Sequence, residues 1–329
     1  MTPSRPRQRV VLLDAFGELD DVAEPLAGLP VEVVRAKRVP SGPGVVALLP
    51  GPRTKLTAEQ VAALPDLRVV AVTAIGYDHI PVQEIAAAGA WVTTSAGYCT
   101  DEVAEHTLAF VLGLLRKVTV LDRSVRQGRW DVLAARPRTA AGSVLGVVGF
   151  GRIGQAVADR AAALGMRVAA YAPKGPDDAF EERAVERHDS LTALLAAADV
   201  VSLHLPLTPA TEGIIDADAL AAMKPGAYLV NVSRGGLVDH RALADALRSG
   251  HLAGAALDVL PTEPPPPGEP LLALPDVIVN PHAAWYSPEA RRRPFRMAAA
   301  YVADVLSGRE PAGAIARPRP ASRAGKDLR

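Results

Sequence analysis

An apolar strand pattern runs directly into Gly149-x-Gly151-x-x-Gly154, and a helical pattern over Gln155–Leu164 follows it. At such a turn the first glycine permits the tight bend, the second lets the backbone approach a pyrophosphate, and the third lets helix and strand pack closely. The helix N-terminus presents N–H groups to the phosphates. A chance glycine turn is the alternative, but the flanking strand and helix favour a dinucleotide-binding site.

Size and charge limit the classes of protein to which the chain can belong. Its 329 residues suffice for about two domains. The 36 basic and 36 acidic residues cancel, so neither nucleic acid nor an anionic membrane is expected as a partner. The single cysteine, Cys99, fits a reducing compartment. The short apolar run Val10–Leu13 is no signal peptide and no stretch is long enough to span a membrane, which predicts a cytoplasmic protein.

Short apolar runs alternate with helical patterns along nearly the whole chain. This alternation predicts an α/β fold with parallel sheets covered on both faces, here two doubly wound units of unequal size. The runs of the first unit are Val10–Asp14, Val31–Val34, Val45–Leu49, Val69–Thr73 and Trp91–Thr94. Those of the second unit are Val144–Val148, Arg167–Tyr171, Val200–His204, Ala227–Val232, Gly254–Leu257 and Val277–Val279.

Several segments outside these runs have patterns of their own. Asp101–Lys117 is a long helical pattern that could connect the two units, although His106 within it is not assigned to chemistry. Arg123–Gly142 is polar and irregular, which suits an arm or loop. The proline-rich segment Pro261–Pro270 must be a rigid loop. The tail from Pro311 onward is rich in Pro, Arg and Ala and is expected to be disordered.

Three polar blocks begin at or just after strands of the second series. They carry Arg234, then Asp258 and Glu263, and then His282. Because open α/β sheets bind ligands at the carboxyl ends of their strands, these side chains should converge beside the dinucleotide. Singly, each has an ordinary explanation, such as a surface turn, a solvated loop charge or a core histidine. Together they indicate a catalytic site.

These blocks resemble those of the D-2-hydroxyacid dehydrogenase family, and the similarity extends from about Val45 to the helix that ends near Leu306. The string P-H-A-A-W-Y-S at Pro281–Ser287 is most similar to the C-terminal-binding-protein branch, which is known for transcriptional corepressors. The family resemblance implies the reduction of a 2-keto acid to a D-2-hydroxy acid with a nicotinamide cofactor.

The resemblance also implies a domain organisation. It predicts two Rossmann-like domains with doubly wound parallel sheets. A flavodoxin-like substrate domain would consist of residues 1–102 and 294–329, with a dinucleotide-binding domain, residues 103–293, inserted in it. A homodimer would form through the dinucleotide-binding domains.

The residue types suggest how such a reduction would proceed. Arg234 would hold the substrate carboxylate and polarise the carbonyl, because its guanidinium is a permanently charged fork. Protonated His282 would donate to the alkoxide that develops when hydride reaches C2. Glu263 would hydrogen-bond the imidazolium and favour the charged form of the ring. These three are the predicted catalytic residues, and no metal site is expected.

The choice between NADH and NADPH depends on the residues after the second strand of the later unit. An NAD site usually has an acidic residue about 20 positions after the first glycine, where this chain has Ala172 and then Lys174. Either Lys174 attracts a 2′-phosphate, so that NADPH is tolerated or preferred, or Asp177 or Asp178 supplies the acid. His204 matches a family position near the nicotinamide ribose, and a purely structural role is an equal alternative. The predicted cofactor residues are Gly149, Gly151, Arg152, Ile153, Gly154, Lys174, His204 and Asp258.

The predicted substrate site combines a backbone turn with side chains. By resemblance, N–H groups of the turn at Ala74, Ile75 and Gly76 hold the substrate carboxylate, and Gly76 allows close approach. The corepressor branch has an arginine shortly before this turn, where this chain has Val72. Trp285 resembles the aromatic residue that closes the pocket in that branch, and core packing explains it equally well.

Three consecutive arginines, residues 291–293, lie between two prolines just after the histidine block. Because prolines favour the first turn of a helix, Pro294 is expected to open the next helix, which leaves the arginines in a basic loop. Arg292 is then a candidate ligand for a second anionic group on the substrate. The alternative is a solvated run of charge.

Two other functions compete with a keto-acid reductase. An NAD(H)-sensing, dimeric, corepressor-like binding protein would use the same fold with incidental dehydrogenase activity, and it would also keep Arg234, Glu263 and His282. Phosphite-oxidising enzymes resemble the family too, but they use a lysine near the carboxylate turn. Residues 72–78 of this chain contain no lysine.

Overall fold

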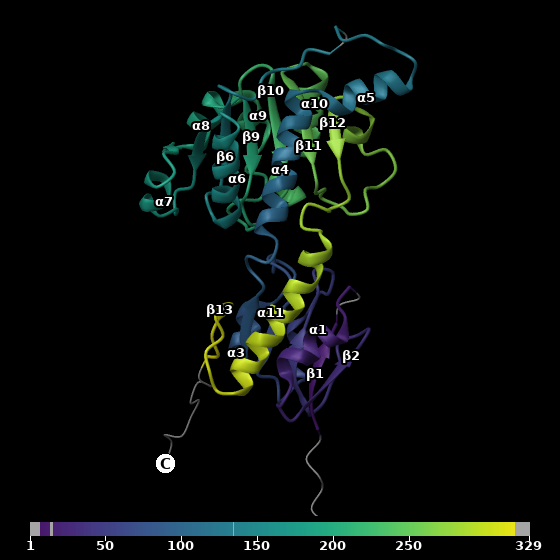
Figure 1. Cartoon of the computed structure of the whole chain (residues 1–329). Coiled ribbons are helices and arrows are strands. Elements are labelled where there is room, and N and C mark those ends of the chain that lie inside the picture. Colours follow the sequence, from purple (N-terminus) through teal and green to yellow (C-terminus); the bar gives the residue numbers. More distant parts are fainter. Residues whose placement is uncertain (1–6, 14–15, 134, 320–329) are drawn as a thin grey trace, which may run out of the picture. The chain divides into compact units, whose positions relative to one another are not determined.

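The structure, a computed structural model, describes residues 7–13, 16–133 and 135–319 (Figure 1). The chain divides into two compact units, one of Met1–Tyr98 with Ser287–Arg329 and one of Cys99–Tyr286. Both boundaries lie a few residues before the expected ones at 102 and 293. The end of the first predicted strand at Asp14 and the end of the tail, residues 320–329, fall outside the described residues.

The first unit contains a six-stranded sheet in the order β13-β5-β4-β3-β1-β2. Strands β1 to β5 are parallel and follow the order 2-1-3-4-5 of flavodoxin-like folds. The strands are β1 Gln8–Leu12, β2 Val31–Arg35, β3 Val45–Leu49, β4 Val69–Val72, β5 Trp91–Thr94 and β13 Ala314–Ala316. The helices are α1 Leu19–Ala23, η1 Glu24–Leu26, α2 Ala58–Ala62, α3 Val82–Ala87 and α11 Pro288–Leu306.

The second unit contains a seven-stranded parallel sheet in the order β12-β11-β10-β9-β6-β7-β8. Its strands from β6 to β11 follow the 3-2-1-4-5-6 order of dinucleotide-binding folds, with β12 added at one edge. The strands are β6 Val144–Val148, β7 Arg167–Tyr171, β8 Glu186–Arg187, β9 Val200–Leu203, β10 Ala227–Asn231, β11 Leu252–Leu257 and β12 Val277–Val279. The helices are α4 Thr100–Leu115, α5 Val118–Arg126, α6 Arg152–Ala163, α7 Asp177–Glu181, α8 Leu191–Ala197, α9 Ala217–Ala222, η2 Gly235–Leu237, α10 His240–Arg248 and η3 Pro270–Ala273. The predicted α/β class with two doubly wound sheets is confirmed.

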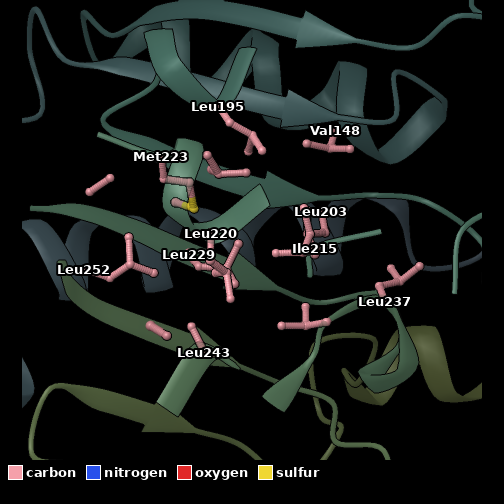
Figure 2. Close-up of a cluster of buried hydrophobic side chains, with 14 of the residues drawn as sticks. Val148, Leu195, Leu203, Ile215, Leu220, Met223, Leu229, Leu237, Leu243 and Leu252 are labelled. Atoms are coloured by element: carbon pink, nitrogen blue, oxygen red, sulfur yellow. The ribbon is translucent and has the colours of Figure 1, made fainter. Parts of the chain in front are cut away.

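Buried aliphatic side chains form the core of the second unit (Figure 2). Leu195 of α8, Leu203 of β9, Leu229 of β10 and Leu243 of α10 are each 0% exposed. Burial of one such side chain contributes about 1.5–3 kcal/mol. The continuous apolar runs of the central strands therefore lie between covering helices, as is typical of parallel sheets. This packing fixes the strand ends from which the polar blocks project.

The helix after the histidine block begins earlier than expected. Ser287 caps α11 by accepting a backbone N–H at 2.9 Å, and Pro288 follows at the first helical position. A capping side chain followed by a proline, whose missing N–H is not needed there, makes a good helix start. The prediction that Pro294 opens the helix is wrong, since Pro294 lies inside it. Residues 291–293 are helical, so the predicted basic loop is also wrong.

Part of the tail is ordered, contrary to expectation. β13 pairs antiparallel with β5, which leaves one strand of this sheet outside the predicted parallel arrangement. The N–H of Thr94 donates to the carbonyl of Gly313 at 3.0 Å just before that pairing. Neighbouring strands pair through backbone N–H and C=O groups. A segment of Ala, Ile and Arg can therefore pair with a sheet edge even though its composition predicts disorder.

The long helical pattern forms one helix, α4, which lies within the second unit and ends at Leu115. Lys117, with a left-handed φ of 54°, separates α4 from α5. Its Nζ donates to the carbonyl of Ala253 and to Asp276, both at 2.8 Å. α4 belongs wholly to the second unit, and α5 takes up the start of the predicted arm. Within the described ranges, no helix has the length and apolar character needed to cross a membrane.

Candidate active site

The glycine turn lies where the strand order of the second unit reverses. The neighbours β6 and β9 meet there, and the N–H of His204 donates to the carbonyl of Val148 at 2.8 Å. Gly149 has a φ of 94°, and a Cβ on it would lie 2.5 Å from the carbonyl oxygen of His204. Both facts require glycine. Such a reversal point is where doubly wound sheets bind their ligands.

The other two glycines fit the roles predicted for a dinucleotide. A Cβ on Gly154 would overlap the carbonyl oxygen of Gly149, so helix α6 packs closely on the turn. A Cβ on Gly151 would meet no described heavy atom within 4 Å, which leaves the backbone at the start of α6 open to a ligand. Arg152 and Ile153 are the first residues of this 12-residue helix, whose N-terminal N–H groups suit a pyrophosphate. The residues present therefore fit a dinucleotide.

The segment around Ala172 contains both cationic and acidic side chains. Ala172 is buried after β7, and Nη2 of Arg187 donates to its carbonyl at 3.4 Å. Asp177 pairs with Arg187, and an oxygen of Asp178 accepts the N–H of the next residue at 2.8 Å. Lys174 is exposed in the turn between β7 and α7. Both acids have a partner within the unit, but both are exposed, so the alternative that one of them binds the ribose stays open.

His204 has a buried ring at the same edge of the sheet. Its Nε2 lies 2.9 Å from the hydroxyl of Ser202. Its Nδ1 is inaccessible to solvent and has no hydrogen-bond partner among the described residues. Burial lowers the pKa of His204 to about 3, so the ring is neutral at ordinary pH. A buried polar atom without a partner is expensive, and contact of His204 with a cofactor stays a prediction.

The structure brings the three predicted catalytic residues together. Nδ1 of His282 lies 2.8 Å from Oε2 of Glu263, and the other oxygen of Glu263 accepts the N–H of Leu260 at 3.1 Å. Burial raises the pKa of Glu263, but the hydrogen bond and charge of His282, the Leu260 N–H and the charge of Arg234 outweigh it. The net effect is a pKa below the ordinary value, so the carboxylate stays ionised.

The backbone around Arg234 is held by its neighbours. The side-chain amide of buried Asn231 donates to the carbonyl of Arg234 at 2.9 Å, and its oxygen accepts the N–H of Ser233 at 3.0 Å. The hydroxyl of Ser233 donates to the carbonyl of Leu203 at 2.7 Å. This turn follows β10 directly and sets the direction in which the arginine leaves the sheet.

Asp258 holds the turn that carries His282. Its carboxylate is 2% exposed and accepts the N–H groups of Ala283 and Ala284 at 2.8 and 2.9 Å. Its carbonyl accepts the N–H of His282 at 2.8 Å. His282 has a left-handed φ of 56°, which costs a non-glycine residue about 1–3 kcal/mol and therefore needs such support. Contact of Asp258 with a cofactor stays a prediction.

The remaining predicted substrate residues belong to both units. In the second unit, Trp285 lies edge-on to Tyr286, with ring centroids 5.5 Å apart. In the first unit, Ala74, Ile75 and Gly76 form the turn after β4, as expected. Arg292 donates through Nε and Nη2 to Asp21, at 2.9 and 2.7 Å, and the Asp21 carboxylate is 1% exposed. This ion pair weighs against a substrate role for Arg292.

Sequence reasoning missed several residues that support the site. Ser202 and Asn231 bond to the predicted site residues His204 and Arg234, and Arg187 bonds to the backbone of Ala172. Asn231 begins the arginine block, and its position at a strand end was a usable signal. Arg187 lies in a two-residue strand, β8, for which the sequence has no clear pattern.

The comparisons with known proteins agree with this geometry. The model of the D-isomer specific 2-hydroxyacid dehydrogenase NAD binding domain matches residues 108–284. A glyoxylate reductase of Korarchaeum cryptofilum is 43% identical over 275 residues, which cover 82% of this chain and 81% of that protein. An (S)-sulfolactate dehydrogenase of Chromohalobacter salexigens is 41% identical over 259 residues, covering 79% and 84%.

Solved structures show the same fold. The TT0316 protein of Thermus thermophilus has a TM-score of 0.81 at 39% identity, covering 94% of this chain and 100% of that chain. An NADPH-dependent glyoxylate/hydroxypyruvate reductase of Sinorhizobium meliloti, in complex with NADP and malonate, has a TM-score of 0.81 at 31% identity, covering 95% and 99%. The two curated relatives are enzymes by name, which gives no support to the corepressor alternative, and closeness to that branch stays a prediction. The matched family model and these relatives together show that the chain belongs to the D-isomer specific 2-hydroxyacid dehydrogenase family and is an oxidoreductase.

Proposed function

We propose that the protein reduces a 2-keto acid to a D-2-hydroxy acid with a nicotinamide cofactor. The observation that carries the proposal is the 2.8 Å contact between His282 and Glu263, with the charge of Arg234 acting on the same carboxylate. A bound NAD(P)H would supply the two electrons as a hydride from its nicotinamide ring. The family match and the names of the relatives support the same reaction class.

The three side chains divide the remaining work. Because Nδ1 of His282 faces Glu263, its Nε2 is the nitrogen left to donate a proton to the carbonyl oxygen of the substrate. Glu263 orients the ring through this contact, and reduction needs the protonated form of the ring. Arg234 would bind the carboxylate and draw electron density from the carbonyl. The turn at residues 74–76 of the first unit would bind the carboxylate through backbone N–H groups.

A panel of 2-keto acids assayed with NADH and NADPH in parallel tests the proposal. Glyoxylate, hydroxypyruvate and a sulfonate-bearing keto acid belong in the panel because relatives are named for such substrates. We expect cofactor oxidation that depends on the keto acid and a product with D configuration where C2 is chiral. Absence of turnover with every member, from protein that binds the reduced cofactor, would reject the proposal.

For the cofactor, we infer that NADPH is preferred or at least accepted. Arg187 donates to the carbonyl of Ala172, the position where an NAD enzyme usually has an acid, and Lys174 is close in sequence. Ala172→Asp should shift the ratio of kcat/KM values toward NADH by about tenfold or more, because a carboxylate repels a 2′-phosphate. Ala172→Asn is the matched control, because it has nearly the same size as Ala172→Asp without the negative charge. An unchanged ratio in Ala172→Asp would count against the inference.

A second anionic group on the substrate is the weaker part of the proposal. Its predicted ligand, Arg292, is bound to the buried Asp21. We therefore expect Arg292→Lys to leave the preference between singly and doubly anionic keto acids unchanged. A selective loss of the doubly anionic substrates would restore Arg292 to the site.

We also propose a homodimer formed through the second unit. Trp130, Val132 and Leu133 are 90%, 74% and 84% exposed in the segment after α5, and Val118 and Val125 of α5 are exposed as well. An apolar cluster of this kind marks an interface. Light scattering on the protein should give the mass of a dimer, and Trp130→Ser with Leu133→Asp should give a monomer. A monomeric wild-type protein would overturn this proposal.

The buried single cysteine, Cys99, keeps a reducing compartment such as the cytoplasm as the proposed location.

A further inference from the structure

A second histidine, which the mechanism above does not use, contacts a residue that lies just before the turn of His282. His106 comes from α4, and its Nε2 lies 3.0 Å from the side-chain nitrogen of Asn280. The same Nε2 lies 4.0 Å from Oδ1 of Asp258. The ring packs edge-on against Phe110, one turn further along α4, with centroids 4.5 Å apart. The ring is thus fixed from both sides within the second unit.

Asn280, the partner of His106 in this contact, lies at the start of the turn that carries His282. Its backbone N–H donates to the carbonyl of Leu257 at 2.9 Å, and it lies two residues before His282. After it, the chain must adopt the left-handed φ of 56° at His282. Asp258 holds the turn from the far side, through the N–H groups of Ala283 and Ala284. The contact of His106 with Asn280 and the bonds of Asp258 to Ala283 and Ala284 thus lie on the two sides of His282 along the chain.

We propose that His106 is a positioning residue that fixes the catalytic turn through Asn280. This inference rests on the proposed function for its effect on turnover, but not for its effect on the turn itself. A strained backbone conformation persists only where its surroundings over-determine it, and a displacement of a proton donor by about 1 Å can lower a rate on the order of a hundredfold. Loss of the His106–Asn280 contact should therefore lower kcat while substrate binding through Arg234 is kept.

The test compares His106→Phe, which keeps the ring volume and the packing on Phe110, with His106→Gln, which offers a hydrogen-bonding amide. We expect kcat to fall about tenfold in His106→Phe, with KM for the keto acid and the Kd of NADPH within about twofold of wild type. His106→Gln should recover most of the loss. His251→Gln is the control, because His251 bonds to the carbonyl of Leu220, in another part of the unit. Equal kcat in wild type and His106→Phe would overturn the proposal.

A double-mutant cycle that combines His106→Phe with Asn280→Ala tests whether His106 acts through Asn280. If His106 acts through Asn280, the double variant should be no slower than the slower single variant, whereas multiplied losses would contradict this route. Amide hydrogen exchange at Ala283 and Ala284 gives a readout that needs no turnover. Exchange there should be faster in His106→Phe and unchanged in His251→Gln. Faster exchange without any keto-acid turnover in wild type would reject the proposed function and keep the positioning role, while unchanged exchange would reject the positioning role.

Discussion

Nδ1 of His282 and Oε2 of Glu263 lie 2.8 Å apart although 19 positions separate them in the chain. The carboxylate belongs to the loop after β11 and the imidazole to the turn after β12, two neighbouring parallel strands. Parallel strands present their carboxyl ends at one edge, so the contact follows from the topology of the sheet. The charge of Arg234, from the turn after β10, acts on the same carboxylate.

Replacement of either His282 or Arg234 should slow the chemical step. We expect His282→Asn to lower kcat at least about a hundredfold through loss of the proton donor. Arg234→Ala should lower kcat further, because the orientation of the substrate and the stabilisation of its developing charge are lost together. Steady-state kinetics at saturating cofactor, with the fold checked by circular dichroism, measure both effects. A kcat of His282→Asn within about threefold of wild type would refute the role of this residue.

The lowered pKa of Glu263 predicts the pH range in which its pairing stabilises the fold. A carboxyl group with a lowered pKa contributes stability above its ordinary value of 4.5 and loses the contribution as pH falls through the lower folded-state value. The difference in unfolding free energy between wild type and Glu263→Gln should shrink as pH falls below about 4.5. Urea unfolding at stepped pH measures this difference. A difference that already shrinks near pH 6 would contradict the lowered pKa.

Burial of His204 should lower the free energy of unfolding as pH falls below 6.5, which is a higher pH than that at which the Glu263 pairing is lost. Its ring stays neutral in the fold down to about pH 3, while in the unfolded chain it is protonated below 6.5. Within that window its contribution falls by up to about 1.4 kcal/mol per pH unit. His204→Gln should therefore gain stability relative to wild type as pH is lowered from 6.5 toward 4. If the free energies of unfolding of wild type and His204→Gln changed equally with pH, the ring would not be buried as described.

The two glycines at the start of α6 should respond differently to alanine. Gly154→Ala meets the Gly149 carbonyl, so we expect a lower Tm and a loss of about 1–3 kcal/mol of stability. Gly151→Ala meets open space and should leave Tm nearly unchanged. Because its methyl group would occupy the approach of a pyrophosphate, its affinity for NADPH should fall at least about tenfold. Fluorescence titration measures the NADPH affinity of the two variants, and thermal melts measure their Tm. Normal NADPH affinity in Gly151→Ala would remove the dinucleotide from this turn.

Much of the fold could be predicted because parallel strands buried on both faces leave long apolar runs in the sequence. β3, β6 and β12 have the bounds expected from such runs. The three predicted catalytic residues could be placed at one sheet edge because each follows a strand of the second unit, β10, β11 or β12. Helix starts were less certain, because Pro288 and Pro294 both satisfy the same local rule. The buried face of α11, with Ala290 and Phe295, favours the earlier start only once the unit is packed.

Other features depend on contacts that no local pattern contains. β13 is three residues long and exists only because β5 offers it a free edge. His106 meets Asn280 across 174 positions, and neither residue is unusual in its own segment. Arg187 reaches Ala172 because β8 lies beside β7 at the sheet edge. Such pairings are set by topology, so they can be found only when the sheet order is known.

The central claim is that Arg234, Glu263 and His282 act together on the keto group of one substrate. The most direct test is a crystal structure of the protein with reduced cofactor and an unreactive 2-keto acid analogue. We expect Nε2 of His282 and the guanidinium of Arg234 within about 2.6–3.2 Å of the analogue's keto or carboxylate oxygens, with Glu263 still on Nδ1. An analogue bound away from these residues, or an Arg234 turned away from it, would contradict the claim.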